Sequence, residues 1–236
     1  MTDSWLHGEM LAFDLETTGV DRFVDVPVSF ALVSMQGGEV IDEFHSLVNP
    51  GREIPEGAAA IHGISQERAE SEGMPLSDAV TAISVALVDA SSRGVPVVGF
   101  NLQYDLTMTD ARLVDQTGKG LRDHGWSGPV IDPLVLDRKF DRYRKGKKTL
   151  DLVCQHYGVV NASAHDAAGD AVASAQVLLS MCQKFPAIAE HDLAEITDLE
   201  AAWHREWAVG FDEFLRSKDL KPIDPRDFDW PIAGSA

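Results

Sequence analysis

Cysteine is scarce in this chain, and long apolar runs are absent. The 236 residues include two cysteines, Cys154 and Cys182, and both fall in segments of helical periodicity rather than in a disulfide or zinc-ligand pattern. No segment has the length and apolarity of a membrane-spanning helix or of a secretion signal. We also find no internal repeat and no phosphate-binding glycine loop. These absences predict a cytoplasmic protein with no membrane association.

Positive charge is also scarce. The chain has 20 Lys and Arg against 38 Asp and Glu, which gives a formal net charge of -18 and a pI near 4.6. Such a charge repels a phosphate backbone and argues against binding nucleic acid by bulk attraction. Seven cations nevertheless lie within eleven residues: Arg138, Lys139, Arg142, Arg144, Lys145, Lys147 and Lys148. This run predicts either a solvated loop or a local contact with a DNA or RNA backbone.

The order of apolar patterns predicts the fold class. Five segments have the pattern of strands: 9–16, 26–35, 40–48, 95–101 and 129–132. Four segments have the pattern of helices: 76–90, 102–116, 149–157 and 167–182. A Gly37-Gly38 turn joins the second strand to the third, which indicates an antiparallel meander. We therefore predict an α/β fold, with a mixed five-stranded sheet and helices on both faces.

The first strand carries two acids near its end. Because side chains alternate along a strand, Asp14 and Glu16 should point to one side, and Leu11, Phe13 and Leu15 to the other. Two neighbouring carboxylates at a buried position repel each other unless a cation lies between them. Oxygen ligands favour Mg²⁺ or Mn²⁺. The pair therefore indicates either a divalent metal site or a strand that runs out into a polar turn.

Two later segments add candidates of the same chemistry. Asp105 lies in the first turn of the helix that follows the strand at 95–101, where the helix dipole also favours an acid. Asn101 precedes this helix in the position of an N-cap. His165 and Asp170 flank the start of the last predicted helix. Asp132 also ends a strand, and we interpret it as a structural acid.

Taken together, these segments resemble the DEDD superfamily of 3'-to-5' exonucleases. The family has Asp-x-Glu on its first strand, a second Asp in an Asn-x-x-x-Asp setting, and a final Asp preceded by His or Tyr. The matching residues here are Asp14, Glu16, Asp105 and Asp170. His165 precedes Asp170 by five positions, as in the DEDDh branch. The resemblance covers about residues 8 to 183.

The resemblance extends to the proofreading epsilon subunits of bacterial DNA polymerase III, through the segment Ile61-His62-Gly63-Ile64. It implies a ribonuclease H-like fold and two divalent ions, Mg²⁺ or Mn²⁺. Asp14 would then bridge both ions, Glu16 and Asp170 would complete one site, and Asp105 would act at the second through water. His165 would be the general base, because imidazole can accept a proton near neutral pH.

The resemblance also assigns substrate contacts. It implies that Thr17, Thr18 and Gly19 receive the terminal nucleotide, that His62 lies near its base or sugar, and that Asn101 supports it. Each has a simpler interpretation. The first three residues fit a strand-ending turn, His62 a solvated loop histidine, and Asn101 a helix cap.

The chain leaves the family's common region after about residue 185. We predict an exonuclease domain at 1–185 and a C-terminal helix and tail at 186–236. The helix, at 192–217, carries an apolar stripe that we expect to pack against the core: Leu199, Trp203, Trp207 and Leu215. Alternatively, the tail is an arm that contacts a second copy of the chain in a dimer.

The resemblance predicts a metal-dependent enzyme that removes nucleoside 5'-monophosphates from the 3' end of DNA. Its partners would be single-stranded DNA or frayed 3' ends, and a DNA polymerase subunit or a second copy of this chain. Two alternatives stay open. One is an exoribonuclease that acts on short or structured RNA ends, and the other is a non-catalytic, polymerase-associated binding module.

Overall fold

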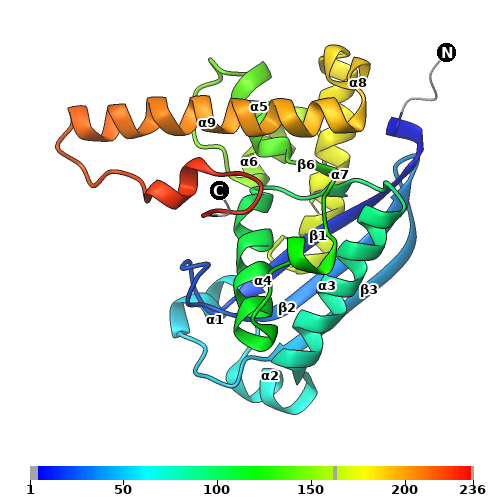
Figure 1. Ribbon diagram of the computed structural model, residues 1–236, viewed down its shortest axis with the longest axis vertical. Coiled ribbons are helices and arrows are strands. Elements are labelled where there is room, and N and C mark those ends of the chain that lie inside the picture. Colours follow the sequence, from blue (N-terminus) through cyan, green and yellow to red (C-terminus); the bar gives the residue numbers. More distant parts are fainter. Residues whose placement is uncertain (1–4, 162–163, 235–236) are drawn as a thin grey trace.

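A six-stranded sheet forms the centre of the computed structural model, which describes residues 5–161 and 164–234 (Figure 1). The strands are β1 (Glu9–Thr17), β2 (Pro27–Gln36), β3 (Glu39–Asn49), β4 (Met74–Pro75), β5 (Val97–Val98) and β6 (Val130–Ile131). Their order across the sheet is β4-β3-β2-β1-β5-β6. The predicted meander of β1, β2 and β3 is antiparallel, and β5 and β6 continue the sheet in parallel with β1. The mixed α/β fold is confirmed.

One more strand is present than the five predicted. The two residues of β4 pair in parallel with the end of β3 and extend that edge of the sheet. A two-residue strand has no periodicity of its own, and Pro75 disfavours a strand interpretation. The pairing arises because the chain returns to the end of β3 after α2 and runs parallel to that strand before α3 begins.

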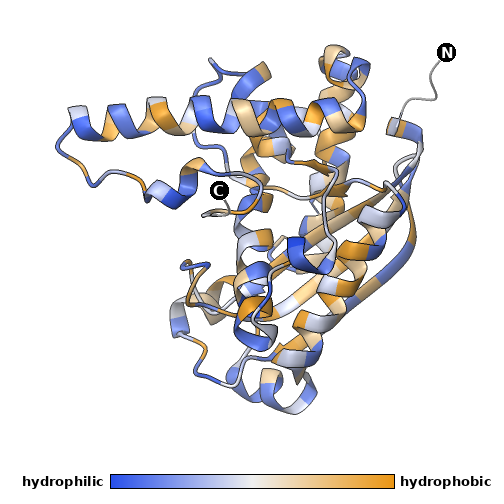
Figure 2. Ribbon diagram, in the orientation of Figure 1, coloured by the Kyte–Doolittle hydropathy of each residue, from blue (hydrophilic) through white to orange (hydrophobic). Residues whose placement is uncertain are grey.

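Helices cover both faces of the sheet. They are α1 (Glu56–His62), α2 (Gln66–Glu72), α3 (Leu76–Ser92), α4 (Leu102–Thr117), α5 (Pro133–Phe140), α6 (Leu150–Tyr157), α7 (Ala167–Lys184), α8 (Ala187–Glu190) and α9 (Leu193–Ser217). Three short 3₁₀ helices are η1 (Trp5–His7), η2 (Arg122–His124) and η3 (Pro225–Phe228). One core lies between the sheet and α3 and α4, and a second lies between the sheet and α6 and α7. Figure 2 shows hydrophobic residues concentrated on the strands and alternating with polar ones along α9.

Side chains alternate along β1 as predicted. Leu11, Phe13 and Leu15 join the core beneath α3 and α4, whereas Met10 and Ala12 join the core beneath α7. Asp14 and Glu16 have the same parity as Met10 and Ala12. Their carboxylates therefore lie on the same side of the sheet as α7, beyond the end of the apolar core.

The second central strand is shorter than its apolar pattern. Only Val97 and Val98 pair as β5, within the predicted segment 95–101. A Cβ built on Gly99 would lie 2.6 Å from the backbone oxygen of Phe13, so the chain approaches β1 there more closely than other residues allow. This approach places the start of α4 beside the end of β1.

Asp132, rather than Asn101, caps α4. Asn101 occupies the N-cap position, as predicted, but it has a left-handed backbone with φ of 63° and its side chain makes no capping hydrogen bond, so the prediction of a side-chain cap is wrong. The carboxylate of Asp132 accepts from the backbone N–H groups of Asn101 and Leu102, at 3.0 Å each, and caps α5 through the N–H of Leu134 at 2.8 Å. Burial raises the pKa of Asp132 to about 6. Asp132 thus ties two helix starts together, as a structural acid.

The C-terminal segment packs on both cores. Ile188 and Ile196 are buried beside α7. Trp203 packs against both cores, which confirms the packing predicted for this one residue of the stripe. Trp230 and Ile232, from the tail, are buried in the core beneath α3 and α4. The division at residue 185 stays a prediction. Of the helices in the described ranges, none has both the length and the apolar character needed to cross a bilayer.

Candidate active site

Four acids from three elements meet at the end of β1. Asp14 and Glu16 belong to β1, Asp105 to the first turn of α4, and Asp170 to the first turn of α7. Asp105 is 4% exposed, and its carboxylate accepts from the backbone N–H of Leu15 at 3.1 Å. This hydrogen bond fixes α4 directly to the acidic end of β1. The predicted convergence of the four carboxylates is therefore present in the structure.

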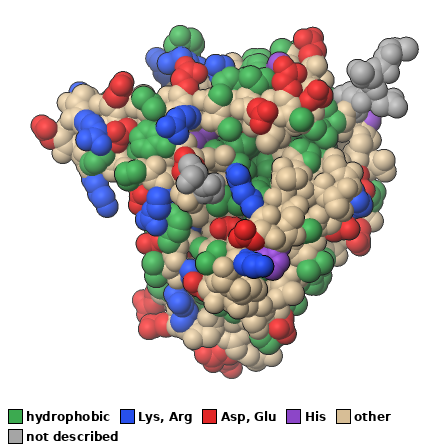
Figure 3. Space-filling view, viewed as in Figure 1, with side chains coloured by type: hydrophobic (Ala, Val, Ile, Leu, Met, Phe, Trp, Pro, Cys, Tyr) green, Lys and Arg blue, Asp and Glu red, His purple; other side chains and the backbone are tan. Residues whose placement is uncertain are grey.

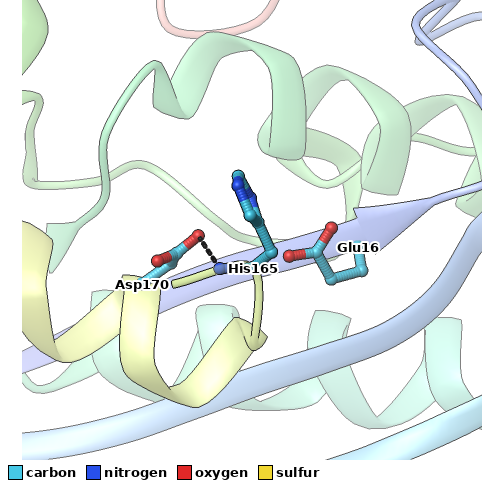
Figure 4. A group of neighbouring side chains, drawn as sticks. All are labelled: Glu16, His165 and Asp170. Carbon is cyan, nitrogen blue, oxygen red and sulfur yellow. Dashed lines mark hydrogen bonds between the residues drawn. The ribbon is translucent and has the colours of Figure 1, made fainter. Parts of the chain in front are cut away.

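Asp170 is held by two donors. The side-chain amide of Asn161 donates to one carboxylate oxygen at 2.6 Å, and the backbone N–H of His165 donates to the other at 3.3 Å (Figure 4). The sequence did not single out Asn161, because no motif spacing links it to Asp170. Asn161 lies just after α6, within hydrogen-bonding distance of the first turn of α7.

The four carboxylates repel one another. Burial, followed by repulsion from Asp105, Asp170 and Glu16, raises the pKa of Asp14 well above its ordinary value. Burial and the charge of Asp170 raise the pKa of Glu16 to about 7. Burial also raises the pKa values of Asp105 and Asp170. Within residues 5–161 and 164–234, no Lys or Arg forms a salt bridge with any of the four. A cation bound between these carboxylates would reduce their mutual repulsion.

The raised pKa of Glu16 predicts that the metal-free protein loses stability as the pH rises. The folded state keeps a proton on Glu16 up to about pH 7, whereas the unfolded state releases it near the ordinary value of 4.5. The contribution of Glu16 is thus fully present below about pH 4.5 and is lost as the pH rises through 7. In EDTA we expect Glu16→Gln to reduce the difference in Tm between pH 5 and pH 8. An unchanged difference, equal to that of the exposed control Glu213→Gln, would contradict the assignment.

His165 lies beside the acids in an unusual backbone conformation. Its φ is 65°, in the left-handed region that residues other than glycine seldom adopt. One ligand atom each of Glu16, His165 and Asp170 lies within 4.8 Å of the others, and Figure 4 shows the exposed ring between the two carboxylates. The backbone turn therefore sets the imidazole at the mouth of the acidic site.

The loop after β1 is fixed by its own hydrogen bonds. Thr17 Oγ1 contacts the hydroxyl of Tyr104 at 3.0 Å and donates to the carbonyl of Gly19 at 2.8 Å. The buried hydroxyl of Thr18 donates to Asp25 at 2.9 Å, and a Cβ on Gly19 would lie 2.6 Å from the same carboxylate. Thr18 and Gly19 thus shape the loop, and Tyr104 is a support that the sequence did not reveal.

His62 and His165 line one cavity of about 340 Å³. The Nδ1 atom of His62 accepts from the backbone N–H of Ile64 at 3.1 Å, which leaves the proton on Nε2. Among the described residues, buried Nε2 has no hydrogen-bond partner. His62 therefore lines a cavity together with His165, but its Nε2 atom is shielded from solvent. Asn101 is exposed at the start of α4, and its side chain is not used as a cap.

The basic run is partly structural. The buried carboxylate of Asp137 pairs with Arg144 at 2.8 Å and with Lys148, and it also accepts from the hydroxyl of Tyr157 at 2.9 Å. Arg144 is 10% exposed and Lys148 19% exposed. The interpretation of the run as a solvated loop is therefore wrong for these two residues, and the contact with a nucleic-acid backbone stays a prediction. Lys145 and Lys147 are exposed.

Comparisons with known proteins agree with this geometry. The RNase T exonuclease family model matches residues 11–178. The PolC-type DNA polymerase III of Thermotoga maritima is 30% identical over 190 residues, which are 80% of this chain and 13% of that protein. Escherichia coli exonuclease I in complex with a dA16 oligonucleotide has a TM-score of 0.65 at 20% identity, over 84% of this chain and 43% of that one. Its zinc-bound complex with single-stranded DNA has a TM-score of 0.64 at 20% identity, with the same coverage.

These comparisons differ in what they establish. The likeness to exonuclease I, at 20% identity, shows the fold alone. The chain corresponds to about an eighth of the length of the T. maritima polymerase. The family model, in contrast, spans most of the chain and includes all four acids and His165. The chain belongs to the RNase T exonuclease family, as a 3'-to-5' exonuclease of the DEDD type.

Proposed function

We propose that this chain hydrolyses DNA from its 3' end and releases nucleoside 5'-monophosphates. The observation that carries the proposal is the group of four carboxylates, from β1, α4 and α7, with no ion pair to Lys or Arg in the described part of the chain. Burying uncompensated acids is costly, and a purely structural role does not require it.

The residues present fit a divalent metal centre. All four side chains offer carboxylate oxygens, the ligands that Mg²⁺ and Mn²⁺ prefer. We propose that Asp14, Glu16, Asp105 and Asp170 would hold two such ions. When bound, the ions would supply a nucleophilic water and neutralise charge on the phosphoryl and leaving oxygens. The zinc-bound form of exonuclease I supports a divalent ion in this fold.

The protein's own groups would position the substrate and move a proton. His165 accepts the proton of the attacking water, since its ring lies beside Glu16 and Asp170 at the mouth of the site. Asn161 keeps Asp170 oriented. The terminal nucleotide lies against Thr17 and the backbone through Gly19, with Asn101 at its side. His62 lies near the base or sugar, in the cavity that it lines together with His165.

Comparison with relatives favours DNA as the substrate. The T. maritima relative is a DNA polymerase, and the exonuclease I complexes contain single-stranded DNA. We propose that single-stranded DNA or frayed 3' ends are bound, and that a DNA polymerase is a partner. Two buried free thiols, Cys154 and Cys182, fit a cytoplasmic location.

The direct test is digestion of a matched set of substrates. We would incubate single-stranded DNA, a primer duplex with a 3' mismatch, and RNA of the same sequence with Mg²⁺ or Mn²⁺. Single-stranded DNA and the mismatched end should be shortened faster than RNA. RNA as the fastest substrate would assign the chain to RNA processing. No cleavage of any substrate, with metal binding retained, would favour a binding module.

Replacing His165 with Ala should lower kcat by about 10²- to 10⁴-fold, because the attacking water loses its proton acceptor. Affinity for Mn²⁺ should change little, since carboxylates hold the ions. Titration calorimetry with Mn²⁺ and steady-state kinetics measure the two quantities separately. His45→Ala is the matched control, because His45 lines the same cavity. An unchanged kcat, or a parallel loss of Mn²⁺ affinity, would remove His165 from the role of base.

A further inference from the structure

A groove with one basic wall and one aromatic wall lies between α5 and the C-terminal half of α9. Its volume is about 370 Å³. The basic wall consists of Arg138, Lys139, Arg142 and Lys148. Three aromatic side chains of α9 form the opposite wall: Trp207, Phe211 and Phe214. Such a group of cations is exceptional in a chain of net charge -18, and Figure 3 shows Lys and Arg side chains gathered at the top of the molecule, above α9.

The aromatic rings form a ladder of nearly parallel planes. The rings of Trp207 and Phe211 are 5.2 Å apart and inclined by 13°, and those of Phe211 and Phe214 are 6.4 Å apart and inclined by 17°. The guanidinium carbon of Arg138 lies 3.4 Å from the centre of the Trp207 ring. Phe211 and Phe214 are 37% and 51% exposed. Exposed, parallel aromatic rings beside cations are the features on which nucleic-acid bases stack.

The basic wall is only loosely neutralised. Lys139 and Arg142 both face Glu206, at 3.4 Å and 3.8 Å, and they are 40% and 69% exposed. Exposed ion pairs of this kind contribute little, so a phosphate can compete with Glu206 for both cations. Lys148 is engaged by Asp137. The groove is also open at Gly210, where an added Cβ would meet no atom within 4 Å.

The groove lies close to the edge that carries the acids. Because β5 and β6 run parallel to β1, α5 begins at the edge of the sheet where β1 ends. The eight residues of α5 span about 12 Å, and Arg138 lies in its second half. A single-stranded nucleic acid whose 3' end lies at the acids therefore needs to extend only about the length of α5 to reach the groove.

We propose that this groove binds the single-stranded nucleic acid on the 5' side of the residue being removed. Bases stack on Phe211 and Phe214, and phosphates contact Lys139 and Arg142. This inference rests on the proposed function, which it deepens by assigning a second binding site for the same strand. It accounts for how an acidic protein holds a polyanion, through one local basic surface.

The test is the affinity for a labelled dT12 and for an abasic 12-mer, measured by fluorescence anisotropy in EDTA so that neither is digested. Replacing Phe211 and Phe214 together by Ala should weaken dT12 binding by about tenfold or more, given that stacking on an aromatic ring changes affinity by about 5- to 150-fold per base. Binding of the abasic strand should be unchanged. Lys139→Ala with Arg142→Ala should weaken both strands and flatten their salt dependence.

Two further variants and a small substrate keep the result interpretable. Gly210→Leu fills the groove without removing an aromatic or a charge and should also weaken dT12 binding, whereas Val209→Ala on the same helix should not. Hydrolysis of a p-nitrophenyl ester of thymidine 5'-monophosphate should be equal in all four variants, because this substrate reaches only the acidic site. Failure of the wild type to cleave that ester would overturn the proposed function and leave the binding measurement valid.

Equal dT12 affinities of the wild type and the Phe211/Phe214 variant would overturn the groove proposal. If light scattering then showed a concentration-dependent dimer of the wild type that the same variant loses, the occupant would be a second copy of the chain. Loss of abasic and dT12 binding in equal measure would also contradict stacking, and would leave only a charge effect.

Discussion

Replacing Asp14 with Asn is expected to lower exonuclease activity on the order of 10³-fold or more in saturating Mn²⁺. Asp14 is the acid whose carboxylate faces all the others, since Asp105, Asp170 and Glu16 each contribute to its raised pKa. In the proposed centre Asp14 would be a metal ligand at the middle of the four acids, so its loss would impair water activation and charge neutralisation together. Steady-state hydrolysis of a 5'-labelled oligonucleotide measures the effect.

The same substitution should stabilise the metal-free fold. Asn removes a buried charge that repels its neighbours, so the Tm in EDTA at pH 8 should rise above that of the wild type. Added Mn²⁺ should raise the Tm of the wild type, because a ligand that binds only the folded state stabilises it, and should raise that of the variant much less. Asp42→Asn, at an exposed position on β3, is the control. Retained activity, or an equal Mn²⁺ shift in both proteins, would contradict a metal ligand at Asp14.

Replacing Asp137 with Ala is expected to lower the free energy of unfolding by about 3–5 kcal/mol. Burial alone would raise the pKa of Asp137, but hydrogen bonds from Arg144 and Lys148 outweigh it and hold the pKa below its ordinary value. The substitution leaves two poorly exposed cations and the hydroxyl of Tyr157 without their shared acceptor. The segment between α5 and α6 should then detach from the core.

Thermal or urea unfolding measures this loss. For a chain of this size the Tm should fall by roughly 6–20 °C. Asp141→Ala is the matched control, because Asp141 lies on the same segment and pairs with His156 and Lys184 at more exposed positions. That variant should lose about 1 kcal/mol or less. Equal losses in the two variants would show that the Asp137 cluster has no special role in stability.

The acidic site was predictable because the family resemblance linked three segments whose local patterns are each clear in the sequence. Alternation along β1 places Asp14 and Glu16 on one side, and the first turns of α4 and α7 bring Asp105 and Asp170 to the same edge. These are local rules that a sequence carries explicitly. Family resemblance then supplied the role of each residue.

The supports of the site were not predictable. Asn161 reaches Asp170, Tyr104 reaches the loop after β1, and the carboxylate of Asp132 reaches the start of α4 across 30 residues of chain. Each contact depends on where two elements meet in space, and no spacing in the sequence links its two partners. The side-chain role of Asn101 was misinterpreted for this reason, because the carboxylate of Asp132, the N-cap residue of α5, caps α4 in its place.

Short elements were missed for a different reason. Helices α1 and α2 have seven residues each and at most one large apolar side chain, which gives no apolar period. In α5 the cations Arg138 and Lys139 hid the helix within a charge run. Two cations of that run, Arg144 and Lys148, complete a buried ion cluster that only the position of Asp137 reveals.

The most direct test of the central claim is the identity of the first product released from a single-stranded DNA labelled at its 3'-terminal phosphodiester, in the presence of Mn²⁺. The account predicts that the label appears at once as a nucleoside 5'-monophosphate, while a 5'-labelled copy shortens one nucleotide at a time, and that Asp14→Asn abolishes both. Release of the label in oligonucleotides or as a 3'-monophosphate would contradict a 3'-to-5' exonuclease built on these four carboxylates.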